Sequence, residues 1–250
     1  MKVTRCIPHT SPMSDHTVSL DILAEMAQYY RDRAPEYDEW FERKGRYDQG
    51  EAANAAWFAD VTEAFAAFDA VHFTGDVLEL APGTGIWTER LLRTVDALTA
   101  IDIAPEMIAQ NEAKVGKGRV RYLLADLFTW EPDRQYDGVC FCFWISHVPE
   151  EQLDGFLRTV AAALKPGGKL FFIDSHPRIK PAQPSAIQLP PEPGSQVLTR
   201  KLNDGRAYRI VKNFLDPRAL EARCHAAGLD VQVHETPYAF IYGTGVRAAR

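Results

Sequence analysis

A glycine-rich segment after an apolar run is the strongest chemical signal in this sequence. The residues Val77-Leu78-Glu79-Leu80-Ala81-Pro82-Gly83-Thr84-Gly85 predict a buried strand that runs into a tight turn and then a helix. Glycine lets a backbone approach a ligand closely, and the first turn of a helix supplies unpaired N–H donors. The segment therefore predicts a nucleotide-like cofactor at the carboxyl end of a sheet.

Acidic residues stand near the ends of successive predicted strands. Glu79 lies inside the first strand, where a carboxylate would repel a pyrophosphate but favour an ammonium or sulfonium group. Asp102 ends the second strand and can accept hydrogen bonds from both hydroxyls of a ribose. Asp126 follows the third strand and is placed to bind the exocyclic amine of an adenine, with Leu127 or Phe128 against the ring. Acids at such places often only cap helices, but in this order they indicate a positively charged adenosyl compound.

Two histidines follow the fourth and fifth predicted strands. His147 comes after Phe143-Trp144-Ile145-Ser146, and His176 comes after Asp174-Ser175. Each could act as a general base toward an acceptor hydroxyl or amine, or could simply form a hydrogen bond that anchors a loop. We take His147 and His176 as the catalytic candidates. No pair of acidic or amide side chains at these strand ends predicts a catalytic metal.

The elements that must position these residues alternate between strand and helix from Gly75 onward. Strands are predicted near 76–80, 97–101, 120–124, 136–143 and 169–173, and helices near 87–94, 105–115 and 150–164. Apolar strands that alternate with helices indicate an α/β fold, in which helices cover both faces of a mainly parallel sheet.

The N-terminal part differs in character. Residues 1–17 are predicted to be a flexible leader and 18–72 a helical lid, with one helix starting after Ser19 and another over 51–70. Tyrosine, tryptophan and arginine side chains gather between these helices. They are consistent either with ordinary helix packing or with a cover over the cofactor, in which an arginine pairs with the cofactor's carboxylate.

An insertion is predicted within the domain that spans 73–250. Residues 177–195 are rich in proline and predict a loop, and the runs 196–202 and 206–214 flank Asn203-Asp204-Gly205, a strong hairpin turn. The insertion 177–214 would form a wall of the substrate pocket. Its basic side chains are either ordinary solvated charges or contacts for an acidic substrate; these are Arg200, Lys201, Arg206 and Arg209. A helix after Asp216-Pro217 and two closing runs, 230–235 and 238–243, complete the chain.

Residues 75–243 resemble a class I S-adenosylmethionine-dependent methyltransferase of the small-molecule type. The resemblance rests on the glycine segment, on Asp102, on Asp126-Leu127 and on Leu164-Lys165-Pro166-Gly167-Gly168-Lys169-Leu170. It implies a Rossmann-like, seven-stranded sheet whose last strand is antiparallel. It also implies methyl transfer from S-adenosylmethionine to an O, N or C nucleophile of a small metabolite, with S-adenosylhomocysteine as product. Alignment of the reacting atoms would supply most of the rate.

The family's motifs imply a set of cofactor-binding residues in this chain. They are Tyr37, Glu79, Ala81, Gly83, Thr84, Gly85, Asp102, Ile103, Met107, Asp126, Leu127 and Phe143.

Composition and charge limit the alternatives. The 250 residues are 46% hydrophobic and 25% charged, with a net charge of −6, which disfavours a nucleic-acid partner. We expect a cytoplasmic protein, monomeric or homodimeric, without membrane contact, acting on a small molecule that can be aromatic. Cys140 and Cys142 are expected to be core thiols rather than metal ligands.

Other functions remain open. An NAD(P)-dependent oxidoreductase is disfavoured by Thr88 at the third glycine position and by Glu79. A protein or nucleic-acid methyltransferase, or a silent binding module, is the remaining alternative.

Overall fold

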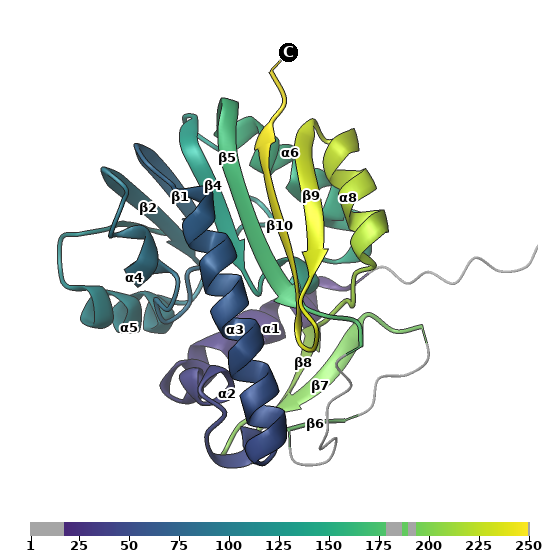
Figure 1. Ribbon diagram of the computed structural model, residues 1–250. Helices are drawn as coiled ribbons and strands as arrows, with labels where there is room; N and C mark the ends of the chain where they lie inside the picture. Colours follow the sequence, from purple (N-terminus) through teal and green to yellow (C-terminus); the bar gives the residue numbers. More distant parts are fainter. Residues whose placement is uncertain (1–17, 179–186, 190–193, 250) are drawn as a thin grey trace, which may run out of the picture.

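The computed structural model describes residues 18–178, 187–189 and 194–249 (Figure 1). Its centre is a seven-stranded sheet with strand order β3-β2-β1-β4-β5-β10-β9. The strands are β1 (Asp76–Leu80), β2 (Ala97–Asp102), β3 (Arg121–Leu124), β4 (Tyr136–Cys142), β5 (Leu164–Ser175), β9 (Leu229–Glu235) and β10 (Phe240–Arg247). Strands β1 to β5 are parallel, and β10 runs antiparallel to both β5 and β9. The predicted sheet with a reversed last strand is confirmed, and the predicted leader lies outside the described residues.

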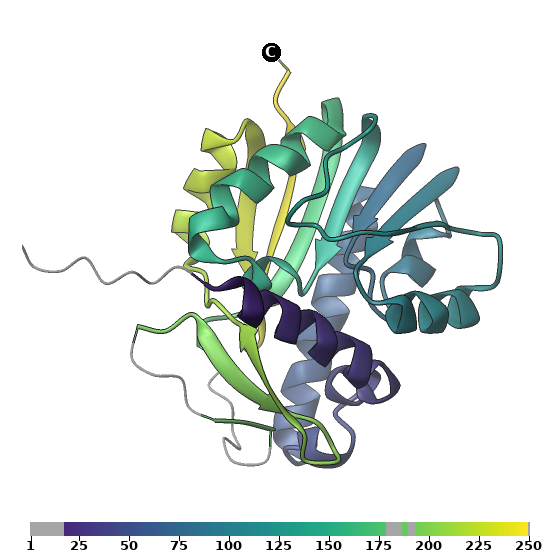
Figure 2. The ribbon, with the colours of Figure 1, turned by 180° about the vertical axis from the view of Figure 1, so that it is seen from behind.

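Helices cover both faces of this sheet. Those on the faces are α3 (Glu51–Val71), α4 (Thr88–Leu91), α5 (Pro105–Val115), α6 (Leu153–Ala163) and α8 (Pro217–Ala226), whereas α1 (Leu20–Arg33) and α2 (Asp38–Phe41) lie at the end of the sheet. The long helix α3 crosses one face in Figure 1, and Figure 2 shows α6 and α8 on the opposite face. Side chains of α3, α4 and α5 share one apolar cluster, whereas α6 and α8 share the other. A sheet covered on both sides explains why its central strands are almost continuously apolar.

The two apolar clusters contain interlocked aromatic rings. Phe141 of β4 and Phe172 of β5 stack with their centroids 5.4 Å apart under α6, and Phe171 packs at 4.9 Å against Phe68 of α3. Gly243 makes room for the ring of Phe172, because a Cβ at Gly243 would lie 2.3 Å from that ring. These contacts fix the sheet between its two layers of helices and so hold the strand ends in place.

The N-terminal helices and a second, three-stranded sheet lie at the carboxyl ends of the parallel strands (Figures 1 and 2). The small sheet contains β6 (Gln188–Leu189), β7 (Val197–Lys201) and β8 (Ala207–Val211). Ion pairs join it to α1: Arg206 binds Asp32 at 2.8 Å and Arg209 binds Glu25 at 2.7 Å. The predicted hairpin is thus confirmed, and its charges Arg206 and Arg209 hold it against the helical lid.

Several predicted boundaries were wrong in detail. The proline-rich stretch was expected to be a loop throughout, but β6 within it pairs with β7. The Lys165-Pro166-Gly167-Gly168 segment lies before the strand predicted near 169–173, but it belongs to β5, where the pairing with β4 becomes irregular. The helix expected from residue 150 begins at Leu153, because Glu150–Gln152 forms a 3-10 turn. The residue pattern of one segment does not show what that segment pairs with or packs against, and these contacts set such boundaries.

Candidate active site

The turn after β1 has the backbone shape that its glycines predict. Ala81, Gly83 and Gly85 all have positive φ angles, of 51°, 55° and 95°. A Cβ at Gly85 would lie 3.0 Å from the side chain of Asn111 on α5, so this position is closed to larger residues. The turn therefore passes tightly between the end of β1 and α5 and presents its backbone toward Tyr37 of the lid.

A buried chain of hydrogen bonds supports this turn from below. Thr88 donates to Glu79 at 2.7 Å, and Asn111 donates both to Thr88 at 2.8 Å and to the carbonyl of Gly83 at 3.3 Å. Burial raises the pKa of Glu79 to about 8, against the lowering effect of the Thr88 hydrogen bond. Glu79 thus ends a network that shapes the loop.

Asp102 ends β2 beside the same turn. Its carboxylate accepts from the backbone N–H of Ala104 at 2.9 Å and from that of Gly83 at 3.3 Å. Burial raises the pKa of Asp102 to about 6, and these backbone hydrogen bonds oppose that rise. With 7% of its surface exposed, Asp102 is a buried carboxylate at the edge of a cavity, as a partner for ribose hydroxyls would be.

That cavity has a volume of about 410 Å³ and lies at the carboxyl ends of β1, β2 and β4. It is lined by Tyr30, Tyr37, Ala81, Gly83, Asp102, Ile103, Met107, Cys142, Phe143, Trp144 and His147. The structure therefore gathers most of the expected cofactor residues around one space. Thr84 lines an adjoining cavity of about 270 Å³, together with Tyr37 and Phe143.

Four of the expected cofactor residues are not among the described residues that line these cavities: Glu79, Gly85, Asp126 and Leu127. Asp126 accepts from the backbone N–H of Phe128 at 2.9 Å, as an acid that stabilises a turn does. Leu127 is buried in the apolar cluster under α6. Their expected roles at the adenine remain predictions.

A larger cavity of about 920 Å³ adjoins the first one and extends between the lid and the small sheet. Its described lining residues are Tyr30, Arg33, Tyr37, Trp40, Arg43, Tyr47, Gln49, Trp57, Phe143, His147, Ser175, Ile187, Arg200, Lys212 and Phe214. Tyr30, Tyr37, Phe143 and His147 line both cavities. These four side chains therefore mark the junction at which a group could pass from one cavity to the other.

Phe143 holds an unusual backbone conformation at this junction. It follows β4 with a φ of 59°, and its N–H donates to the carbonyl of Ile173 at 2.7 Å. Its ring contacts Trp40 of the lid with centroids 4.8 Å apart. A left-handed conformation in a bulky residue is costly and often marks a functional position.

The larger cavity carries an excess of positive charge. Arg33, Arg43, Arg200 and Lys212 line it, and none of its described lining residues is acidic. Lys212 pairs with the buried Asp174 at 2.9 Å, but within the described ranges no salt bridge compensates the three arginines. Arg33 is 4% exposed, and its Nε has no hydrogen-bond partner in the described structure. A buried guanidinium without a counter-ion is a binding group for an anion.

His147 is one of the two predicted catalytic histidines, and the structure brings it to the junction. Its Nδ1 lies 2.6 Å from the carbonyl oxygen of Val211, and its Nε2 lies 2.7 Å from the hydroxyl of Tyr30. Burial, and then the charge of Lys212, lowers the pKa of His147 to about 3, although Asp174 and the Val211 carbonyl oppose this. The imidazole is therefore neutral near neutral pH.

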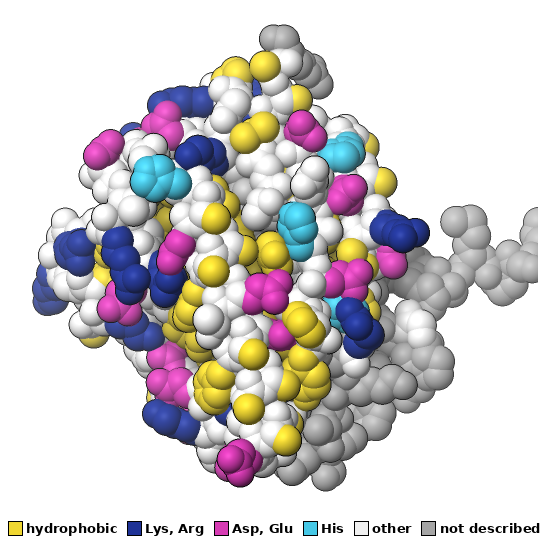
Figure 3. Space-filling view, viewed as in Figure 1, with side chains coloured by type: hydrophobic (Ala, Val, Ile, Leu, Met, Phe, Trp, Pro, Cys, Tyr) yellow, Lys and Arg dark blue, Asp and Glu magenta, His cyan; other side chains and the backbone are white. Residues whose placement is uncertain are grey.

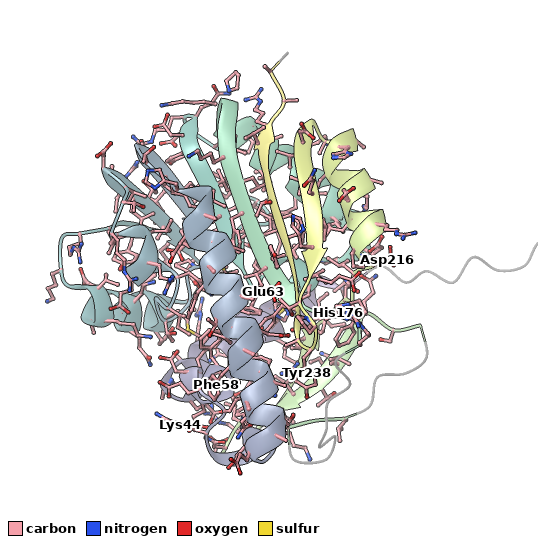
Figure 4. All side chains as sticks on the ribbon, in the orientation of Figure 1. Lys44, Phe58, Glu63, His176, Asp216 and Tyr238 are labelled. Atoms are coloured by element: carbon pink, nitrogen blue, oxygen red, sulfur yellow. The ribbon has the colours of Figure 1, made fainter. Side chains whose placement is uncertain are left out.

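His176, the second predicted catalytic residue, is not brought to the site. Its Nε2 lies 2.6 Å from a carboxylate oxygen of Glu235 on β9, and its Nδ1 accepts from the N–H of Arg178 at 2.8 Å. Figure 4 shows it near Tyr238 at the lower ends of β9 and β10. It is absent from the described lining of both cavities, whereas Ser175 beside it lines the larger one. His176 follows the last residue of β5, and its contact with Glu235 holds the ring beside β9.

The lid is fastened over the glycine turn by Asp38. One of its carboxylate oxygens accepts from the hydroxyl of Thr84, and the other pairs with Lys114 of α5 at 2.8 Å. Asp38 thus joins the second lid helix to the glycine turn and to α5. That the lid covers the cofactor remains a prediction.

Sequence reasoning missed three residues of the site. Tyr30 was grouped with the lid aromatics without a role, and Lys212 and Trp144 were given none. Trp144 is buried at the smaller cavity, and its indole N–H has no partner among the described residues. In the sequence, only His147 and the nearby acids indicated a site at these strand ends. Lys212 follows a hairpin, and the sequence does not show where that hairpin packs. The thiols of Cys140 and Cys142 are buried and free, and Cys142 also lines the smaller cavity.

The sheet order and the position of the cavities define the class of protein. A doubly wound sheet that binds its ligand outside the carboxyl ends of its strands is the arrangement of Rossmann-like, nucleotide-binding proteins. A family model described as a methyltransferase domain matches residues 77–168. No helix in the described ranges is long and apolar enough to cross a membrane, and no metal-binding cluster of His, Cys, Asp or Glu occurs in them.

Solved structures resemble the chain over nearly its whole length. A structure titled "DhpI-SAH complex structure" is 34% identical with a TM-score of 0.72, and the match covers 93% of this chain and all (100%) of that one. Another, titled "DhpI-SAM-HEP complex", is 36% identical with a TM-score of 0.73, covering 92% and 99%. The chain belongs to the class I S-adenosylmethionine-dependent methyltransferases.

The matches to two curated relatives cover a smaller part of this chain than the solved structures do. The ubiquinone biosynthesis O-methyltransferase of Xanthomonas euvesicatoria is 30% identical over 161 residues, which are 62% of this chain and 63% of that protein. The demethylmenaquinone methyltransferase of Tropheryma whipplei is 37% identical over 106 residues, or 41% of this chain and 43% of that protein. The matches thus span about half of the length of these curated relatives.

Proposed function

We propose that this protein transfers a methyl group from S-adenosylmethionine to an oxygen atom of a small anionic acceptor. The smaller cavity fits the cofactor, because it combines a buried carboxylate at Asp102 with apolar walls. The structural relatives whose titles include SAH and SAM support the same cofactor. The larger cavity is the proposed acceptor site.

Chain residues around the smaller cavity have distinct proposed roles. Asp102 would accept from ribose hydroxyls, Met107 and Ile103 would contact the adenine, and Tyr37 would lie near the amino-acid end. When bound, the cofactor supplies a methyl group already activated on a sulfonium. The protein therefore contributes alignment at the junction and exclusion of water by the lid.

The uncompensated arginines of the larger cavity carry the proposal. Arg33, Arg43 and Arg200 converge on one space without a described acidic neighbour. Bringing like charges together is unfavourable, and a bound carboxylate or phosphate group would relieve that repulsion through charge-assisted hydrogen bonds. The aromatic side chains of Trp40, Trp57 and Phe214 line the same space and could hold an apolar or flat part of the acceptor.

The same charges favour an oxygen nucleophile. An amine acceptor is an ammonium ion at neutral pH, and the arginines would repel it. An anionic oxygen needs no general base, which agrees with the neutral and already hydrogen-bonded imidazole of His147. We therefore no longer assign His147 the role of base that the sequence indicated.

A paired acceptor panel tests this function. Small carboxylic acids and phosphate monoesters are incubated with methyl-labelled S-adenosylmethionine beside the corresponding amides and alcohols. We expect label only in methyl esters of the acids. Equal transfer to amides, amines or neutral alcohols would contradict the proposal.

Variants of one arginine locate the acceptor site. Arg33→Gln should raise the acceptor KM by about tenfold or more, because a hydrogen bond to a charged group contributes about 1.5–3 kcal/mol. Arg218→Gln, an exposed position on α8, is the matched control and should leave KM unchanged.

A further inference from the structure

The hydrogen bonds of His147 fix which of its ring nitrogens carries hydrogen. The partner of Nδ1 is the carbonyl oxygen of Val211 at 2.6 Å, and a carbonyl oxygen can only accept. In the neutral imidazole, Nδ1 is therefore the donor and Nε2 carries a lone pair. The hydroxyl of Tyr30, 2.7 Å from Nε2, must then be the donor in that contact.

The direction of the hydrogen bond from Tyr30 to His147 determines whether the Tyr30 hydroxyl can donate or accept at the junction. Its only hydroxyl hydrogen is committed to His147, so the phenol oxygen is left with lone pairs. Tyr30 and His147 both line both cavities, so the contact between the phenol oxygen and the imidazole lies at the junction where cofactor and acceptor would meet. A lone pair there can accept a hydrogen bond from an O–H group that lies beside the reacting oxyanion on the same acceptor.

We propose that Tyr30 selects an anionic acceptor that still carries an O–H group, because it accepts a hydrogen bond from that group. His147 is a positioning residue that holds the Tyr30 hydrogen away from the acceptor. The inference rests on the proposed function and narrows its substrate class. The suitable acceptors are anions such as hydrogen phosphate monoanions or hydroxy acids, held by the arginines on one side and by Tyr30 on the other.

The surroundings of His147 agree with this positioning role. The charged groups that act on its ring are Lys212 just after β8, Asp174 from β5 and Arg200 from β7, with Tyr30 from α1 as its direct partner. Burial and the two cations disfavour a second proton on the ring, against the opposing effects of Asp174 and the Val211 carbonyl. The tautomer, and with it the direction of the Tyr30 hydrogen, therefore stays fixed across ordinary pH.

Nitrogen NMR of the histidine-labelled protein tests the tautomer directly. We expect His147 to show hydrogen on Nδ1 and a bare Nε2 across neutral pH. In Tyr30→Phe, Nε2 should stay bare but shift, because it loses its hydrogen-bond donor. Hydrogen on Nε2 in the wild type would overturn the inference, whatever the enzyme methylates.

Two simple anions test the selection. Inorganic phosphate at about pH 6 is mainly a monoanion that carries O–H groups, whereas sulfate of similar shape carries none. Calorimetry with protein saturated by S-adenosylhomocysteine should show phosphate binding about tenfold more tightly than sulfate, since one hydrogen bond contributes about that factor. Tyr30→Phe should abolish the preference, and Tyr29→Phe should keep it. Tyr29 is the matched control, because its buried hydroxyl has no described partner and it lines neither cavity.

The outcomes separate this inference from the proposed function. Equal binding of both anions by the wild type would overturn the selection by Tyr30 but leave an anion-binding acceptor site. A preference that survives in Tyr30→Phe would also overturn it. Binding of neither anion would overturn the anionic acceptor itself, and the inference with it.

Discussion

The ammonium group of Lys212 lies 2.9 Å from the carboxylate of Asp174, and both side chains are almost completely buried. Lys212 follows β8 of the small sheet, and Asp174 belongs to β5 of the large one. Lys212 also donates to the hydroxyl of Ser146 at 2.7 Å, next to His147. This buried ion pair therefore joins the hairpin insertion to the main sheet at the edge of the larger cavity.

Removing one member of this pair should strongly destabilise the protein. Lys212→Met leaves the Asp174 carboxylate buried without its cation, and such a change costs about 3–5 kcal/mol. Urea unfolding followed by tryptophan fluorescence measures the loss. The double variant Lys212→Met/Asp174→Asn should recover a large part of it, because no buried charge is then left unpaired. A double variant as unstable as the single one would contradict this explanation.

Glu79 should make the folded protein less stable as the pH rises. Burial raises its folded pKa to about 8 from an ordinary value near 4.5. The folded state therefore holds more protons than the unfolded state between these values, and the unfolding free energy falls as pH increases through that window. Between about pH 5 and 8, we expect the unfolding free energy of the wild type to fall by about 2–4 kcal/mol relative to that of Glu79→Gln. The unfolding free energies are measured by denaturant titration at several pH values. The same dependence on pH in both proteins would refute this.

Asp102→Asn should weaken cofactor binding. The amide loses the charge with which Asp102 would accept from ribose hydroxyls, and we expect about tenfold lower affinity for S-adenosylhomocysteine by calorimetry. The wild-type affinity should also decline as pH falls through about 6, where the Asp102 carboxylate takes up a proton. Asp96→Asn, an exposed acid before β2, serves as control and should bind normally. An unchanged affinity in Asp102→Asn would remove this residue from the cofactor site.

Loosening the lid should speed cofactor release. Asp38→Asn removes the charge that pairs with Lys114, a partly exposed contact that contributes modestly, and it also weakens the hydrogen bond from Thr84. Stopped-flow measurements should show S-adenosylhomocysteine dissociating about three to ten times faster. The control Glu42→Gln removes a carboxylate at the end of α2 whose described partner is the exposed Lys44. Equal dissociation rates in wild type and Asp38→Asn would show that this contact does not fasten the lid.

Local patterns were sufficient for the central sheet and for the turn that follows β1. Apolar runs, glycines and an acid after each strand are encoded within a few residues, and parallel strands place their ends at one edge. This is why Gly83, Asp102 and Phe143 were predicted and found together. Glu79 shows the limit of such reasoning, because its acidity indicated a cationic ligand while its hydrogen bond goes to Thr88.

The sequence by itself determined the sheet, the glycine turn and the family, since each depends on short-range residue order. Only the tertiary structure decided which residues line the larger cavity, the proposed acceptor site. Arg33, Tyr30 and Lys212 come from a lid helix and a hairpin far apart in the chain, and ion pairs between these segments bring them to one cavity. It also decided between the histidines, because the carbonyl of Val211 holds His147 at the junction whereas Glu235 holds His176 away from it. Contacts between distant segments depend on packing and charge in three dimensions, which no local pattern specifies.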